Sequence, residues 1–156
     1  MSKVVPFSRS ASYLHQRAVK NRREGHLLDA LELTRRALEK DPDNRDYALD
    51  MAQVLCELGA YIQSNRVLSH MLAQDPDLYE CYFGMACNFY GMNDADASYK
   101  ALMCFLSEDP QAAGRREVGE LLHNLFITRT LMGQKSRRRA RAARLAGKGL
   151  ALLRSG

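Results

Sequence analysis

The chain has 156 residues, of which 46% are hydrophobic and 26% charged, and its formal net charge is +5. This length suits one domain or a short array of repeats that share an elongated core. The hydrophobic content excludes general disorder, and no apolar run approaches the roughly 20 residues that a membrane-spanning helix needs. Pro6 and Arg9 interrupt the amino-terminal region before any apolar run typical of a signal peptide. We therefore expect a soluble, cytoplasmic protein.

Charge is distributed unevenly along the chain. Residues 1–26 have a net charge of +5, residues 27–110 a net charge of −9 with fifteen acidic side chains, and residues 111–156 a net charge of +9. The small overall charge therefore conceals an acidic middle between two basic ends. Attraction to anionic partners is expected only at the ends.

Three Asp-Pro pairs divide the chain at a fixed interval, with consecutive prolines 34 residues apart: Asp41-Pro42, Asp75-Pro76 and Asp109-Pro110. Because proline has a fixed φ and no N–H, it tends to end helices. Gly25 and Gly59 each stand 17 residues before one of these prolines, and Gly91 and Asn93 lie near the corresponding place of the third unit. Glycine and asparagine adopt the left-handed conformation found at helix ends. Each unit is thus predicted to be a helix, a tight turn, a second helix and an Asp-Pro turn.

Apolar residues recur at the helical spacing i, i+3, i+4, i+7, as in Ala48-Met51-Ala52-Leu55. First helices are predicted near 11–24, 46–58 and 79–91, and no useful stretch alternates with the period of a strand. After a linker at 111–116, we expect a helix near 116–132 that ends at Gly133, then a last helix near 136–154. The predicted fold class is all-α.

The 34-residue helix–turn–helix period resembles the tetratricopeptide repeat (TPR). The small and closing positions of that pattern fall on Ala18, Gly25, Ala30, Ala37 and Pro42 in the first unit, and on Ala52, Gly59, Ser64, Met71 and Pro76 in the second. The third unit has Ala86, Asn93, Ser98, Phe105 and Pro110 there. The resemblance implies a right-handed α-solenoid with units at 11–43, 44–77 and 78–110, after an extension at 1–10. It also suggests that residues 117–156 contain the start of a further, truncated repeat.

Nothing in the sequence indicates catalysis or a cofactor. The four cysteines show no zinc-like spacing, and the four histidines are scattered outside known ligand motifs. Phosphate-binding loops and hydrolase motifs are absent. We expect a non-enzymatic protein with no bound cofactor or metal.

The resemblance implies a concave face lined by the first helix of each unit. In some members of the family, this face binds the terminal carboxylate of a peptide through Lys, Asn and Arg; here those positions are His15, Val19, Gln53, Glu80 and Gly84. Carboxylate binding is therefore not expected. The residues predicted to form a peptide-binding groove are Val19, Leu49, Gln53, Cys56, Glu80, Phe83, Cys87 and Tyr90. Such a groove suits an apolar or amphipathic segment with some positive charge. The alternative is that these residues are core, or are covered by later helices of the chain itself.

A second candidate surface is the arginine-rich segment near the carboxyl end. At about 100° per residue, Arg137, Arg141, Arg144 and Lys148 share one helix face, with Arg138 beside them. This face is a candidate for binding nucleic acid or an anionic membrane surface. The alternative is a solvated helix face, or a cover for the acidic middle of the chain.

Our hypothesis from sequence is a TPR adaptor that binds a peptide or helix of another protein on its concave face. Two alternatives stay open: a binder of nucleic acid or an anionic surface through the arginine-rich helix, and a self-associating scaffold that forms homo-oligomers. The sequence does not name the partner.

Overall fold

The structure of the chain is a computed structural model that describes the backbone of residues 10–154 and the side chains of residues 10–146. It consists of seven α-helices and one short 3-10 helix, and this part of the chain contains no strand. The helices are α1 (Ala11–Arg23), α2 (Leu27–Lys40), α3 (Arg45–Glu57), α4 (Tyr61–Gln74), α5 (Glu80–Gly91), α6 (Ala95–Glu108), η2 (Pro110–Gly114) and α7 (Arg116–Arg154). The all-α prediction is confirmed.

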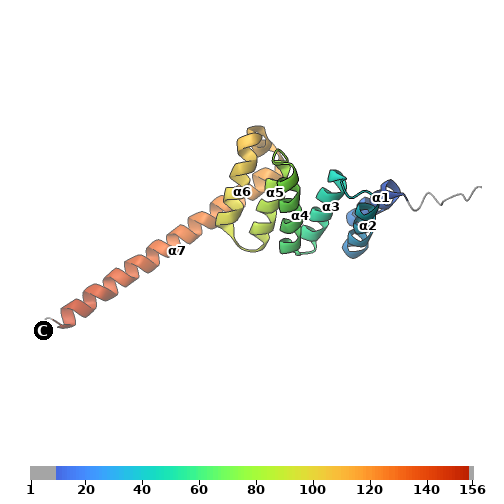
Figure 1. Cartoon of the computed structure of the whole chain (residues 1–156). Coiled ribbons are helices and arrows are strands. Elements are labelled where there is room, and N and C mark those ends of the chain that lie inside the picture. The colour runs from blue at the N-terminus through green and yellow to red at the C-terminus, as the bar shows by residue number, and fades with distance from the viewer. Residues whose placement is uncertain (1–9, 155–156) are drawn as a thin grey trace, which may run out of the picture.

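The first six helices form three pairs that follow one another along the molecule (Figure 1). Within each pair the helices pack side by side, and the second helix of one pair also packs against the first helix of the next. The pairs α1–α2, α3–α4 and α5–α6 lie within residues 11–43, 44–77 and 78–110. Each helix therefore buries its apolar face on sequence neighbours, as in repeat proteins.

The turn between the helices of each pair is the same in all three pairs. Its left-handed residue is Gly25 (φ +83°), Gly59 (φ +76°) and Asn93 (φ +61°) in turn. The next amide donates to a carbonyl five residues earlier, as in the 2.8 Å bond from Ala60 N–H to Leu55 C=O. Of the two residues expected in the third turn, Asn93 has the left-handed conformation. Gly91 is instead the last residue of α5, with the Tyr61 ring packed where a β-carbon would lie.

The two helices of a pair approach closely at a small residue. Ala18, Ala52 and Ala86 are each at most 3% exposed. In the second and third pairs a serine of the facing helix donates a 2.7 Å hydrogen bond to the carbonyl of that alanine: Ser64 to Ala52 and Ser98 to Ala86. Because a larger side chain at the alanine would separate the helices, this contact fixes the shape of each unit.

Beyond the pairs the structure differs from the sequence prediction, because residues 116–154 form one continuous helix. The predicted helix end at Gly133, and the separate helix near 136–154, are wrong. An isolated glycine costs a helix only about 1 kcal/mol relative to alanine, and the sequence around Gly133 has no proline to break the helix. The 3-10 helix η2 (Pro110–Gly114) overlaps the predicted linker at 111–116, and it buries Ala112.

The first turns of α7 pack on the last pair, and the rest of the helix projects away from the molecule (Figure 1). Val118, Leu121 and Leu125 are buried in the same core cluster as Leu102 and Phe105. From Arg129 to Ala146 every side chain is exposed, and we call residues 129–154 the arm. None of the helices in the described part of the chain is both long and apolar enough to cross a membrane.

Arg129 attaches the base of the arm to α6. Its guanidinium carbon lies 4.0 Å from the centre of the Tyr99 ring, and its Nε lies 3.6 Å from a carboxylate oxygen of Asp96. This position interrupts the apolar stripe of α7, and the cation–π contact explains why an arginine is accommodated there.

We predict opposite effects for two glycine-to-alanine substitutions. Gly133→Ala should stabilise the arm helix by about 1 kcal/mol, because Gly133 is helical with open space around it. Amide exchange in the arm should then slow roughly fivefold. Gly59→Ala should instead lower the free energy of unfolding by more than about 1 kcal/mol, because its φ is +76°. A Gly133→Ala variant with unchanged exchange in the arm would contradict a continuous helix.

We also predict that two leucines of α7 differ in their effect on stability. Leu125→Ala should cost about 2–5 kcal/mol in urea unfolding, because Leu125 is 0% exposed in the core cluster. Leu131→Ala, at 59% exposure in the arm, should change stability by less than about 0.5 kcal/mol. An equal loss of unfolding free energy from the two substitutions would mean that the arm packs on the helix pairs.

Candidate peptide-binding groove

A groove of about 570 Å³ lies between α3, α5 and the first turns of α7. The inner side of α4 closes its floor. The volume is of the size that binds a few side chains of a ligand. The lining residues are Leu49, Ala52, Gln53, Cys56, Glu57, Ser64, Leu68, Glu80, Phe83, Gly84, Cys87, Glu117, Glu120, Leu121 and Asn124.

The floor of the groove is mainly apolar, and all the charged residues at its walls are acidic. Glu57, Glu80, Glu117 and Glu120 line it, and no lysine or arginine does. Arg22 lies 3.8 Å from Glu57, and Arg116 lies 2.9 Å from Glu120, so two of the carboxylates have a cationic neighbour. Glu80 and Glu117 form no ion pair with any described residue. The groove therefore has a negative potential over an apolar floor.

Six of the eight residues predicted for the groove do line it: Leu49, Gln53, Cys56, Glu80, Phe83 and Cys87. Val19 of α1 and Tyr90 near the end of α5 lie outside this lining, although Tyr90 is 38% exposed. Phe83 also packs on the core, with its ring centre 5.4 Å from that of Phe105. The side chain of Phe83 therefore belongs both to the groove and to the core.

Sequence reasoning did not identify the wall that α7 contributes. Glu117, Glu120, Leu121 and Asn124 follow one another at helical spacing and so lie on one side of the helix. That spacing was visible in the sequence, but the repeat pattern gave no register for a helix outside the repeats. The alternative of coverage by later helices holds only in part, since α7 borders the groove and leaves it open.

Two side chains of α1, His15 and Arg22, connect the first pair to α3 of the second. His15 Nε2 is hydrogen-bonded to a carboxylate oxygen of Asp50, and the His15 ring stacks on Tyr47 at 4.5 Å between centres. Arg22 Nη1 is buried without a hydrogen bond among the described residues, 3.8 Å from Glu57. These contacts fix the orientation of α1 relative to the groove.

Two thiols line the groove from neighbouring helices, Cys56 on α3 and Cys87 on α5. Burial raises the pKa of the Cys87 thiol to about 11, with a further contribution from the nearby Cys56 and Glu117. Burial also raises the pKa of Cys56. Both groups are therefore neutral at physiological pH and contribute to the apolar floor. Within residues 10–146 no three His, Cys, Asp or Glu side chains are arranged to bind a metal ion.

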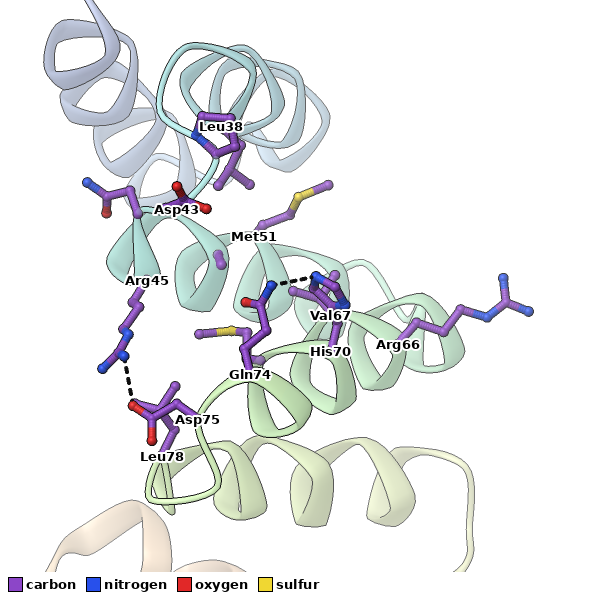
Figure 2. A pocket seen from close by; sticks show the side chains of 14 residues that line it. Leu38, Asp43, Arg45, Met51, Arg66, Val67, His70, Gln74, Asp75 and Leu78 are labelled. Atoms are coloured by element: carbon purple, nitrogen blue, oxygen red, sulfur yellow. Dashed lines mark hydrogen bonds and ion pairs between the residues drawn. The ribbon is translucent and has the colours of Figure 1, made fainter.

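A second cavity, of about 600 Å³, lies between the first and second pairs, on α3, α4 and the end of α2 (Figure 2). Leu38, Met51 and Val67 supply apolar surface there. Its charges are of both signs, and Arg45 forms a 2.8 Å ion pair with Asp75. Because the cavity is lined by two arginines and two aspartates, it has less preference for a charged ligand than the acidic groove.

The arginines of the second candidate surface lie on the arm, about 20 Å or more along the helix axis from the groove wall at Asn124. Arg137, Arg138, Arg141 and Arg144 are exposed, and none of them forms an ion pair with a described residue. The side chain of Lys148 lies outside the described residues. The binding of an anion by this surface stays a prediction.

Residues 22–80 match the tetratricopeptide repeat family. A curated relative, the TPR repeat-containing protein YvcD of Bacillus subtilis (strain 168), is 25% identical over 127 residues, covering 81% of this chain. The match covers 26% of YvcD, so the chain spans about a quarter of the length of that relative.

Solved structures share the fold at low sequence identity. The Sgt2 TPR domain from Aspergillus fumigatus superposes with a TM-score of 0.69 at 15% identity, over 83% of this chain and 87% of that domain. The first TPR of Spaghetti (RPAP3), bound to the HSP90 peptide SRMEEVD, gives a TM-score of 0.66 at 15% identity, over 79% of this chain and 95% of that one. The predicted α-solenoid is confirmed.

The surroundings of the thiols predict an order of alkylation. At pH 8, iodoacetamide should modify the exposed Cys104 first and Cys87 much more slowly, because only about one in a thousand Cys87 thiols is ionised at a pKa of about 11. The Cys87 rate should rise about tenfold per pH unit while the protein stays folded. Mass spectrometry after limited alkylation measures both rates. Equal rates at pH 8 would show that the floor is open to solvent.

Proposed function

We propose, from the match of residues 22–80 to the tetratricopeptide repeat family, that the chain is a non-enzymatic adaptor that binds a basic amphipathic helix or peptide of another protein in the groove. The observation that carries this proposal is the combination of an apolar floor with four glutamates and no basic residue at the walls. An amphipathic segment with Lys or Arg beside its apolar face complements both features.

The groove is already rigid before a ligand binds, so only the ligand has to become ordered on binding. Its floor is formed by residues that are also part of the core, since Ala52 and Leu68 are at most 3% exposed. Ser64 and Asn88 add a buried hydrogen bond of 2.8 Å between α4 and α5. Because these walls are held in place before binding, the groove loses little conformational entropy when a ligand enters.

The same charges disfavour acidic peptides. The RPAP3 domain is bound to the peptide SRMEEVD, which has three acidic side chains and one basic side chain. In this chain the positions that resemble a carboxylate-binding set are His15, Val19, Gln53, Glu80 and Gly84, which include no lysine or arginine. Glu80 and its acidic neighbours would repel such a peptide.

We predict that a fluorescently labelled amphipathic peptide of Leu and Lys binds to the chain and that SRMEEVD does not. The double variant Glu80→Lys, Glu117→Lys replaces the two unpaired glutamates. It should raise the dissociation constant of the Leu/Lys peptide at least about tenfold, which corresponds to about 1.4 kcal/mol. Fluorescence anisotropy at physiological salt measures the dissociation constants. The substituted side chains are exposed, so circular dichroism should show an unchanged fold.

The matched control is Asp29→Lys with Glu108→Lys, which makes the same change of net charge at exposed positions on α2 and α6 outside the groove. This control should retain most of the affinity. If both double variants lose affinity equally, binding follows the overall charge of the protein and the assignment of the groove is wrong.

A further inference from the structure

We propose that the groove of one copy binds the arm of a second copy, so that the chain assembles head to tail. This inference rests on the proposed function, because it names an occupant for the same groove. It starts from the contrast between the two surfaces: the groove is lined by four acidic residues, and the arm is basic.

Beyond Arg129, the described arginines of the arm have no acidic partner on their own molecule. Residues 121–156 contain no aspartate or glutamate, and Arg137, Arg138, Arg139, Arg141 and Arg144 form no ion pair with a described residue. Arginines at spacings of three and four residues repel one another along a helix. An acidic surface that accepts this helix relieves that repulsion.

One face of the arm combines charge with apolar surface in the way the groove requires. Arg138, Arg141, Ala142 and Leu145 stand at i, i+3, i+4 and i+7, and Leu131 lies one heptad before Arg138. Leu131 and Leu145 are about 60% exposed, although they are large apolar side chains. Against the groove, the leucines match the apolar floor, and the guanidinium groups match Glu80 of α5 and Glu117 of α7.

The arm does not reach the groove of its own molecule. The helix is continuous from the groove wall at Glu117 to Arg154, and Figure 1 shows it leading away from the repeats. Arg138 lies roughly 20 Å beyond Asn124 along a rigid axis. Neutralisation of the arm by this groove is therefore intermolecular. Because arm and groove are different surfaces, each copy offers one of each, and the contact generates chains or closed rings.

The test is the mass of the full chain in solution, measured by sedimentation velocity over a range of protein and salt concentrations. The average mass should rise with protein concentration at about 0.15 M salt, and association should weaken toward about 1 M salt, where charges are screened. The arm variant Arg138→Glu, Arg141→Glu, Arg144→Glu should raise the dissociation constant at least tenfold. The groove variant Glu80→Lys, Glu117→Lys should do the same.

A control variant separates this contact from an effect of net charge. Arg36→Glu, Arg66→Glu and Lys100→Glu make the same charge change as the arm variant, at exposed positions on α2, α4 and α6. This control should associate like the unmodified chain. All substitutions are at exposed side chains, and thermal unfolding monitors the fold of each variant.

Mixing the two defective variants gives the decisive result. The arm variant keeps an intact groove, and the groove variant keeps an intact arm, so the mixture should regain the association that each variant alone has lost. An unmodified chain that stays monomeric, or a mixture that stays monomeric, overturns the proposal. A chain that is monomeric alone but binds a DNA duplex through its arm also overturns it and assigns the arm to nucleic acid.

The peptide titration separates this proposal from the proposed function. If the Leu/Lys peptide binds the groove of the arm variant while the unmodified chain stays monomeric, the groove function stands and the second-copy occupant is wrong. If the peptide fails to bind and the chain stays monomeric, both are wrong.

Discussion

The close approach of the two helices in each pair is the constraint on which the rest of the structure depends. Ala18, Ala52 and Ala86 allow this approach, and a left-handed residue seven positions later reverses the chain. Because both features recur every 34 residues, the first helices of successive pairs present equivalent positions to the same side. The groove is a consequence of this register: Gln53 and Cys87, from equivalent positions of α3 and α5, line it together.

The fold was largely predictable from the sequence because its determinants are local. Proline, glycine and small residues act on the backbone within a few positions, so their spacing predicts helices and turns directly. The groove residues on α3 and α5 could be predicted for the same reason, since the repeat gives the orientation of their side chains. Val19 and Tyr90 have equivalent orientations but lie outside the lining, because the position of the groove along the array is set by α7.

The structure of α7 was not predictable in the same way. Gly133 resembles the turn glycines Gly25 and Gly59 in the sequence, yet it lies within a helix. A glycine adopts either conformation at small cost, and the choice depends on whether a partner helix is available to pack against. From Thr130 to Ala146 the side chains are exposed, and Gly133 keeps the helical conformation of its neighbours. Glu117 and Glu120 become groove residues only through the packing of Val118, Leu121 and Leu125 on the last pair, which is a tertiary effect.

The continuity of α7 at Gly133 also determines how the charges of the chain can be neutralised. A break there would let the arginine-rich segment fold back over the acidic residues 27–110, which is the cover that the sequence suggested as an alternative. A continuous helix keeps the two regions apart, since the arm extends for roughly 40 Å from its attachment at Arg129, and the side chains from Thr130 to Ala146 are exposed. Gly133 lowers the cost of a bend by only about 1 kcal/mol, which is less than the cost of breaking several helical hydrogen bonds. The acidic and basic regions of one chain are therefore separated by a rigid element, and each remains available to a separate molecule.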